Sequence, residues 1–207
     1  MSTLLSEVLR PTTFDDLVIS DDIKTRLIKM RDTQNLMNML FHGKPGSGKT
    51  SATKLFSESD TFDTITINGS LETSVAHVRE QILAFTTSSS LFCQPKIVII
   101  DEADYLSKNA QAALRKVIED TSKVCRFVFT ANNLSKIDPA LRSRLLLVSF
   151  DMTASQIQRS LNAYKERVLK VLSEKSPTLN LSRATQIIDM HFPDYRSIAN
   201  HLEFEYI

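Results

Sequence analysis

Short apolar runs alternate with longer amphipathic segments up to about residue 151 of the chain. Five runs have the length and residue types of buried strands, at 36–41, 64–67, 96–100, 127–130 and 145–150. Three of the intervening segments, 49–57, 74–85 and 109–119, have helical spacing. Near-continuous apolar strands that alternate with helices indicate a parallel sheet with helices on both faces.

The pattern changes after Asp151. Strand-like runs stop, and three segments with helical periodicity follow at 153–173, 181–191 and 195–204. Pro177 separates the first two segments, because proline disfavours continuation of a helix. The sequence therefore predicts an α/β domain over residues 1–151 and a small all-helical domain over residues 152–207.

Glycine is scarce in the chain, yet three of its four glycines fall within six residues. They belong to a G-x-x-x-x-G-K-T pattern between a predicted strand and a predicted helix. In that setting the bare backbone of the loop surrounds an anion, the helix N-terminus adds positive potential, and the lysine reaches the outer phosphates. The pattern predicts an ATP-binding P-loop with these contact residues: Gly43, Pro45, Gly46, Ser47, Gly48, Lys49 and Thr50.

An acidic pair, Asp101 and Glu102, follows the predicted strand 96–100. Open α/β sheets bind ligands at this end of their strands. We expect the Thr50 hydroxyl and Asp101 to hold Mg²⁺, and Glu102 to orient and polarise the water that attacks the γ-phosphate. The alternative is a strand that merely ends in solvated acidic residues, and the P-loop nearby favours the first interpretation.

Composition and charge narrow the class of protein. The chain has 207 residues, 42% hydrophobic and 24% charged, which is typical of a globular protein. Its first residues lack the pattern of a secretion signal, and no apolar run is long enough to span a membrane. We expect a protein of the cytoplasm, that of the host if it is viral, or of the nucleus, without a membrane partner. Cys93 and Cys125 form no metal-ligand pattern and are expected in the core.

Five segments in one order resemble the replication-factor-C family of sliding-clamp loaders, which are AAA+ ATPases. They are RPTTFDDLVISDDIKTRL, GKPGSGKT, DEADYLSKNAQAALRKVIE, TANNLSKIDPALRSR and FPDYRSIANHL. The resemblance spans residues 7–202 and is nearest to the large clamp-loader subunit of T4-like bacteriophages. Two features depart from the family: Leu145 replaces a cysteine, and the chain ends at Ile207, before the helical collar domain.

The resemblance implies an ATPase that binds ATP and Mg²⁺ and assembles with other clamp-loader subunits. Such an assembly helps to open a sliding clamp and load it onto primer-template DNA. Two alternatives stay open: another AAA+ replication ATPase of the helicase-loader type, and a nucleotide-binding assembly or regulatory protein with little turnover alone. Stimulation of ATP hydrolysis by clamp and primed DNA distinguishes the three.

Three catalytic positions carry over from the family. Asn132 matches sensor 1, beside the alternative Asn133, and Arg196 matches sensor 2 in the lid. Arg144 matches the arginine finger, which acts on the nucleotide of a neighbouring subunit. Because Arg144 precedes the last core strand, we expect it on the far side of the sheet from the P-loop by strand order. The alternative is an ion pair with a nearby carboxylate.

The segment before the first strand also carries a family match. Arg10 and Pro11 match residues that lie over the adenine in clamp loaders. The neighbouring apolar residues Phe14, Leu17 and Val18 fit the same role, or a local core.

Two surfaces for macromolecules are expected from the resemblance. Helix starts in the core of clamp loaders follow the DNA backbone, and phosphate contacts require positive charge without base readout. The candidates are Arg79, Lys108, Arg115 and Lys116. Residues 74–92 match the region that touches the clamp. Ile82, Leu83 and Phe85 are its candidate apolar anchor, or they face the sheet.

Overall fold

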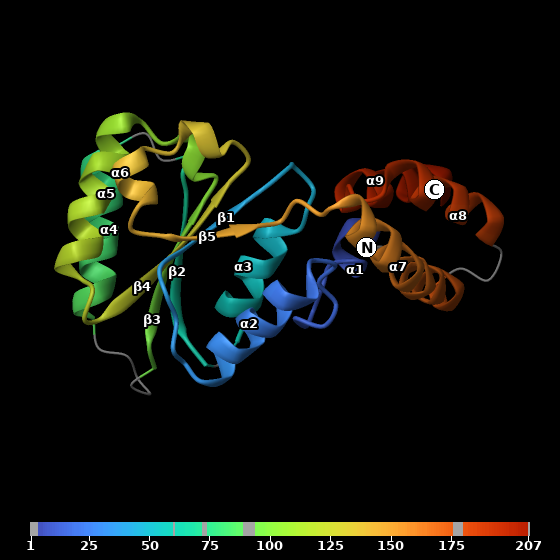
Figure 1. Ribbon diagram of the computed structural model, residues 1–207, viewed down its shortest axis with the longest axis horizontal. Coiled ribbons are helices and arrows are strands. Elements are labelled where there is room, and N and C mark those ends of the chain that lie inside the picture. Colours follow the sequence, from blue (N-terminus) through green and yellow to red (C-terminus); the bar gives the residue numbers. More distant parts are fainter. Residues whose placement is uncertain (1–3, 60, 72–73, 89–93, 176–179, 207) are drawn as a thin grey trace.

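A computed structural model of the chain describes residues 4–59, 61–71, 74–88, 94–175 and 180–206. Its centre is a five-stranded parallel sheet with the strand order β2-β3-β4-β1-β5 (Figure 1). The strands are β1 (Met39–His42), β2 (Asp63–Asn68), β3 (Lys96–Asp101), β4 (Cys125–Ala131) and β5 (Leu146–Ser149). The expected parallel α/β core is therefore confirmed.

Successive residues of a strand pack on opposite faces of the sheet. In β1, Leu40 contributes to one hydrophobic cluster, whereas Met39 and Phe41 contribute to the cluster on the other face. All three side chains are fully buried. The strand reads as a continuous apolar run because both of its faces are covered.

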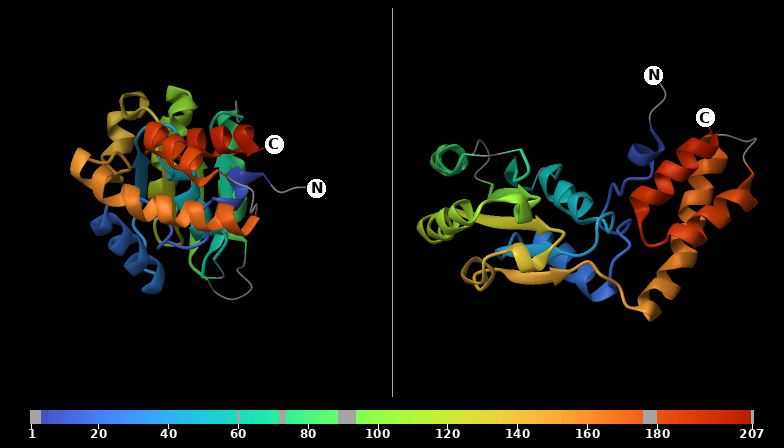
Figure 2. Two further views of the ribbon diagram at one scale, coloured as in Figure 1. Left: turned by 90° about the vertical axis from the view of Figure 1, so that its right-hand side faces the viewer. Right: turned by 90° about the horizontal axis from the view of Figure 1, so that it is seen from above.

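Helices cover both faces of the sheet (Figures 1 and 2). One face packs against α2 (Asp21–Asp32) and α3 (Lys49–Ser57), the other against α4 (Val75–Thr87), α5 (Lys108–Asp120) and α6 (Pro139–Arg142). Side chains cap the N-termini of several helices. The Ser107 hydroxyl accepts a hydrogen bond from the backbone N–H of the third residue of α5, and the Asp138 carboxylate accepts two from backbone N–H groups of α6. Such caps satisfy backbone N–H groups that have no partner within the helix.

Three further helices form a separate layer beyond the carboxyl ends of the strands (Figure 2). They are α7 (Ala154–Lys175), α8 (Leu181–His191) and α9 (Tyr195–Tyr206). Their own hydrophobic cluster includes the buried Val168, Ile188 and Leu202. The short helix α1 (Leu5–Val8) and Leu9 pack against this layer. The helical lid is thus present, and it includes contacts from the start of the chain; the boundary at residues 151 and 152 stays a prediction.

Of the two interpretations of the apolar residues on α4, packing against the sheet is confirmed for Ile82. This side chain is completely buried in the cluster between α4 and the sheet, and Phe85 packs against the same cluster. Leu83 is half-buried. The helical spacing of residues 82 and 85 therefore reflects core packing, which is its commoner use. The part of the predicted clamp region at residues 89–92 lies outside the described residues.

Other sequence expectations have mixed outcomes. Cys125 is buried in the core, as expected, and Cys93 lies outside the described residues. Helix α2 was not predicted. Its only buried residue is Leu27, so the apolar periodicity that marks a helix is weak there. In the part of the chain that the structure describes, no helix has both the length and the apolarity needed to cross a membrane.

Candidate nucleotide-binding site

The P-loop joins the carboxyl end of β1 to the first residue of α3. Gly46 and Gly48 have φ angles of +77° and +93°, in the left-handed region that side chains rarely adopt. Gly48 directly precedes α3 and turns the chain into the helix. The start of α3 lines a cleft with a cavity volume of about 190 Å³, so its free N–H groups and positive dipole end lie at the wall of that cleft.

Lys49 lies inside this loop, with only 6% of its surface exposed. Its ammonium donates hydrogen bonds to the carbonyl oxygens of Gly43 and Lys44, both at 2.8 Å. Burial lowers the pKa of Lys49, and the charges of three surrounding aspartates oppose that shift. Among the described residues no carboxylate lies within ion-pair distance of this ammonium. Its charge is therefore available to an anion in the loop.

The two expected Mg²⁺ ligands contact each other directly. The Thr50 hydroxyl lies 3.2 and 3.3 Å from the two carboxylate oxygens of Asp101, and Thr130 donates a hydrogen bond to the same carboxylate. Within the described ranges, no cluster of three or more His, Cys, Asp or Glu residues can hold a metal. A hydroxyl beside one carboxylate nevertheless fits Mg²⁺, which is commonly held by few protein oxygens together with phosphates and water.

Glu102 follows this aspartate in an unusual backbone conformation. Its φ angle is 55°, in the left-handed region, and its backbone N–H donates a hydrogen bond to the Thr130 hydroxyl at 2.9 Å. Non-glycine residues in such conformations cost of order 1–3 kcal/mol and concentrate at functional sites. The turn places Glu102 on the wall of the same cleft as Thr50.

The structure separates the roles of the two neighbouring asparagines. Asn132 lines the cleft. The Asn133 side chain instead accepts hydrogen bonds from the backbone N–H and the hydroxyl of Ser135. Asn133 thereby caps the short helix η2 (Leu134–Lys136). The buried Asp104 accepts hydrogen bonds from the backbone N–H groups of both asparagines and so holds this turn in place. Asn132 therefore lines the cleft and Asn133 does not, and the sensor 1 role of Asn132 stays a prediction.

The N-terminal end of α9, in the lid, forms one wall of the cleft. Arg196 lines the cleft, as expected for sensor 2. Its neighbour Tyr195 donates its backbone N–H to the Gly46 carbonyl at 3.3 Å and its hydroxyl to the Val18 carbonyl at 2.8 Å. Burial raises the pKa of Tyr195, which keeps the hydroxyl protonated as a donor. The lid thus touches both the P-loop and the segment before the sheet.

Another part of the cleft wall is formed by the segment that contains Arg10 and Pro11. Both residues line the cleft, together with Leu17 and Val18. Leu17 and Phe14 are also buried in the cluster beneath α2 and α3. The local core is therefore present for Phe14 and Leu17, and contact of this segment with adenine stays a prediction.

Sequence reasoning missed Thr130 and Tyr195 in this site. Thr130 has a detectable signal, since it lies near the carboxyl end of a predicted strand, where open sheets bind ligands. Tyr195 has none, because its hydroxyl partner, Val18, is 177 residues away in the sequence.

The structure corrects the reason given for the position of Arg144. Strand β5 pairs directly with β1, so strand order does not place this arginine far from the P-loop. Arg144 instead precedes the amino end of β5, whereas the P-loop follows the carboxyl end of β1. The guanidinium forms an ion pair with Glu119 at 2.6 Å and a hydrogen bond to the Ala140 carbonyl. The ion-pair alternative is therefore present in the single chain.

The four basic residues expected at DNA lie on α4 and α5, which pack side by side. Arg79, Lys108 and Lys116 are exposed. Arg115 is partly buried, with a guanidinium nitrogen 3.9 Å from the Asp138 carboxylate. Their contact with DNA stays a prediction.

Residues 39–150 match the model of the AAA family, described as ATPases associated with various cellular activities. The chain is 31% identical over 205 residues to the probable replication factor C subunit 5 of Dictyostelium discoideum. It is 32% identical over 203 residues to the replication factor C small subunit of Archaeoglobus fulgidus. Each match covers 95% of this chain, and the chain spans 57% and 62% of the lengths of these two relatives.

Solved structures show the same fold at lower sequence identity. A variant of the Thermotoga maritima RuvB protein superposes with a TM-score of 0.69 at 22% identity, covering 95% of this chain and 64% of that one. The Aeropyrum pernix ORC1 protein, solved in complex with DNA, gives a TM-score of 0.60 at 17% identity, covering 96% and 62% of the two chains. These likenesses concern the arrangement of sheet, helices and lid.

Proposed function

The chain belongs to the AAA family of ATPases, and we propose that it is a clamp-loader subunit that binds and hydrolyses ATP during DNA replication. One observation carries the proposal: five predicted nucleotide-site residues converge on one cleft, in a chain similar to replication factor C subunits. These residues are Lys49, Thr50, Glu102, Asn132 and Arg196. They come from the P-loop, the ends of two strands and the lid, which sequence distance alone does not bring together.

Each group has a defined task in this proposal. Lys49 and the N–H groups at the start of α3 bind the phosphates, and Thr50 and Asp101 hold Mg²⁺. When bound there, a metal ion would supply charge that neutralises the phosphate oxygens. Glu102 orients the attacking water and polarises its O–H bond, while Asn132 positions that water or the γ-phosphate.

The lid and the surface helices extend the proposal to partners. Arg196 moves with α9, so the position of the lid decides whether a second positive charge reaches the phosphates. Exposed basic residues on α4 and α5 provide charge for the backbone of primer-template DNA. Arg144 completes the site of a neighbouring subunit once assembly breaks its contact with Glu119. ATP binding then favours an assembly that grips clamp and DNA, and hydrolysis releases both.

The test is ATP hydrolysis measured with the sliding clamp and primed DNA from the same source, added separately and together. A clamp-loader subunit, alone or with its partner subunits, is stimulated most when both are present. The Lys49→Ala variant is the control and should lose nucleotide binding, because Lys44, the other lysine of the loop, is exposed and does not line the cleft. Unchanged ATP affinity in this variant would contradict the nucleotide site itself.

The other outcomes identify the two alternatives. Stimulation by a replicative helicase but not by a clamp indicates a helicase loader. Tight ATP binding without turnover under any condition indicates an assembly or regulatory protein. The contact between Arg144 and Glu119 favours slow turnover in the isolated chain, since it occupies the arginine that the proposal assigns to a neighbour.

A further inference from the structure

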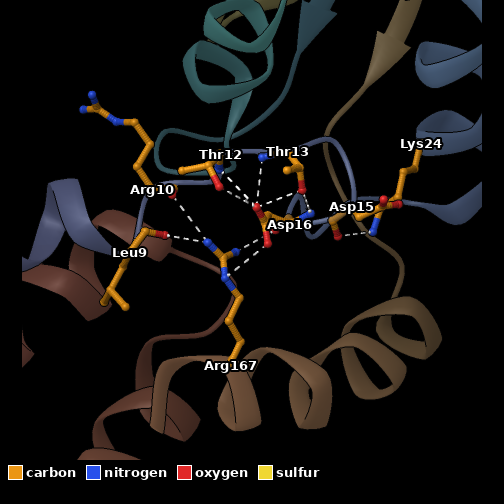
Figure 3. A network of polar contacts seen from close by, with 8 residues as sticks. All are labelled: Leu9, Arg10, Thr12, Thr13, Asp15, Asp16, Lys24 and Arg167. Atoms are coloured by element: carbon orange, nitrogen blue, oxygen red, sulfur yellow. Dashed lines mark hydrogen bonds and ion pairs between the residues drawn. The ribbon is translucent and has the colours of Figure 1, made fainter. Parts of the chain in front are cut away.

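An arginine of the lid contacts the segment that contributes Arg10 and Pro11 to the cleft wall. Arg167, on helix α7, donates hydrogen bonds to three backbone carbonyl oxygens, at 2.8 Å for Asp16, 3.3 Å for Leu9 and 3.4 Å for Arg10 (Figure 3). Its Nε also lies 3.6 Å from the Asp16 carboxylate. One guanidinium therefore bridges the lid and residues 9–16, which are about 150 positions away in sequence.

The Asp16 side chain organises the same segment from within. One carboxylate oxygen accepts hydrogen bonds from the backbone N–H and the hydroxyl of Thr12 and of Thr13, at 2.9 to 3.1 Å (Figure 3). Burial alone would raise the pKa of Asp16, but the hydrogen bonds from Thr13 and Thr12 and the charge of Arg167 together lower it. The carboxylate is therefore ionised when it holds this turn.

Apolar packing does not fix this part of the segment. Leu9 and Phe14 are buried, but the four residues between them are half-buried or exposed. Two of those four, Arg10 and Pro11, line the cleft. We therefore expect the shape of the cleft wall at Arg10 and Pro11 to depend on the polar contacts of Asp16 and Arg167. A planar guanidinium can serve several carbonyl oxygens and a carboxylate at once, which a lysine ammonium does less well.

We propose that Arg167, acting through Asp16, is a positioning residue that shapes the nucleoside end of the cleft and ties it to the lid. We call the pair the clasp. The inference rests on the proposed ATP-binding function. Asp16 and Arg167 themselves line the cleft, but in the described part of the chain their side-chain hydrogen bonds and ion pair join only each other and residues 9–16. We therefore expect the P-loop to bind phosphates without the clasp. Because α7 and α9 share one hydrophobic cluster, the clasp also links the nucleoside wall to the element that carries Arg196.

The test compares ATP with inorganic tripolyphosphate, which has the phosphates but no nucleoside. Affinities for both are measured by calorimetry for the wild type, Arg167→Ala, Arg167→Lys and Asp16→Asn. We expect Arg167→Ala to weaken ATP binding by about tenfold, a typical effect of losing charge-assisted hydrogen bonds. Binding of tripolyphosphate should change by less than about twofold, because the P-loop carries it. Arg167→Lys should recover only part of the loss.

The controls separate the clasp from general damage. Arg159 lies on the same helix, is exposed, and bonds only within its own helix in the described structure, so Arg159→Ala should change neither affinity. Thermal unfolding checks that each variant folds, and Asp16→Asn tests the clasp without shortening a side chain. The double variant should bind ATP no more weakly than the worse single variant, because the two residues act as one unit.

The results that would contradict the clasp differ from the results that would contradict the ATP site. Equal loss of ATP and tripolyphosphate affinity in Arg167→Ala, or no loss of either in both clasp variants, would contradict the clasp. Failure of the wild type to bind ATP, or tight binding by Lys49→Ala, would contradict the nucleotide site and therefore the proposed function.

Discussion

The Asp194 carboxylate of the lid fills the space that a side chain on Gly46 would need. A Cβ atom built on Gly46 would lie 2.1 Å from Oδ1 and 2.8 Å from Cγ of Asp194. Gly46→Ala should therefore push the lid away from the P-loop and strain a backbone with positive φ, which costs an ordinary residue about 1–2 kcal/mol. We expect ATP hydrolysis to fall by more than about tenfold. Steady-state turnover at saturating ATP measures this effect.

A second substitution separates the collision from the backbone strain. Asp194 also accepts a hydrogen bond from the Ser197 backbone at the start of α9, so Asp194→Ser keeps a capping oxygen on a shorter side chain. The double variant Gly46→Ala with Asp194→Ser should recover part of the lost turnover. If the double variant recovers none, the lid contact at Gly46 does not limit activity.

Glu102→Gln should keep ATP binding and stop hydrolysis. The amide preserves the shape of the side chain but lacks the charge that polarises the attacking water. We expect turnover to drop by at least about a hundredfold, in the range typical of a lost general base. Binding of a fluorescent ATP analogue should stay within twofold of wild type, by the same argument about shape. A variant that hydrolyses ATP at the normal rate would show that Glu102 is not the base.

Arg144→Ala should leave ATP affinity unchanged and remove the part of the activity that rises with protein concentration or with added partner subunits. The arginine precedes the amino end of β5, whereas the P-loop follows the carboxyl end of β1, so we expect it to act on the site of a neighbour. A mixture of two variants tests whether Arg144 acts in trans. Lys49→Ala protein, which keeps Arg144, should restore hydrolysis to Arg144→Ala protein. No recovery in a mixture that demonstrably associates would exclude a role in trans.

Glu119 provides a matched test of the same arginine. Its carboxylate holds the Arg144 guanidinium in the single chain, with both side chains partly exposed, so the pair itself contributes little stability. Glu119→Gln should free the arginine, and hydrolysis in the assembly should equal or exceed that of the wild type. A loss as large as that of Arg144→Ala would mean that the ion pair, and not the free arginine, is required.

Replacement of Lys108, Arg115 and Lys116 by alanine should weaken duplex DNA binding about equally for all sequences. Contacts to phosphates carry no sequence information, and each one lost should lower the slope of log K against log salt by about one. Arg26 and Lys29 on α2, which packs on the other face of the sheet, supply the control, and their replacement by alanine should leave binding unchanged. Filter binding at several salt concentrations measures the DNA affinity and the salt slope of the triple variant and of the control. An unchanged salt slope in the triple variant would exclude this surface.

The free energy of unfolding at acidic pH should depend on the ionisation of Asp16. The folded-state pKa of Asp16 is below its ordinary value of 3.8, so its contribution to stability is present above that value and is lost as pH falls through the folded-state pKa. At pH 7 we expect Asp16→Asn to lower the free energy of unfolding by roughly 1–3 kcal/mol, as for hydrogen bonds to a charged group. The difference between the two proteins should shrink below about pH 4 in urea titrations. A constant difference down to pH 2 would contradict this.

The sequence predicts best what local patterns encode. The five strands are recognisable because burial on both faces makes each a short apolar run, and the P-loop because Gly46 and Gly48 have backbone conformations that suit glycine. Helix α2 escapes detection because its only buried residue is Leu27. Ile82 was ambiguous, since a helix face directed at the core and one directed at a partner have the same spacing.

Contacts between distant segments set the limit of the sequence reasoning. Nothing in the residues around Arg167 indicates that its partner is Asp16, and nothing near Tyr195 indicates Val18. The position of Arg144 was inferred from chain order, but β5 lies beside β1 in the sheet, and only the pairing register shows that opposite strand ends separate the two sites. These relationships depend on topology, which a single sequence does not specify.

The separation of Arg144 from the P-loop also has a consequence for symmetry. Each chain has its cleft at one end of the sheet and Arg144 near the opposite end. If the arginine acts in trans, the subunits join head to tail, through two different surfaces, and such contacts build rings or spirals and not closed two-fold dimers. In an open spiral the cleft of one terminal chain receives no arginine. A spiral of n chains therefore has at most n − 1 complete sites, and only closure into a ring supplies the last one.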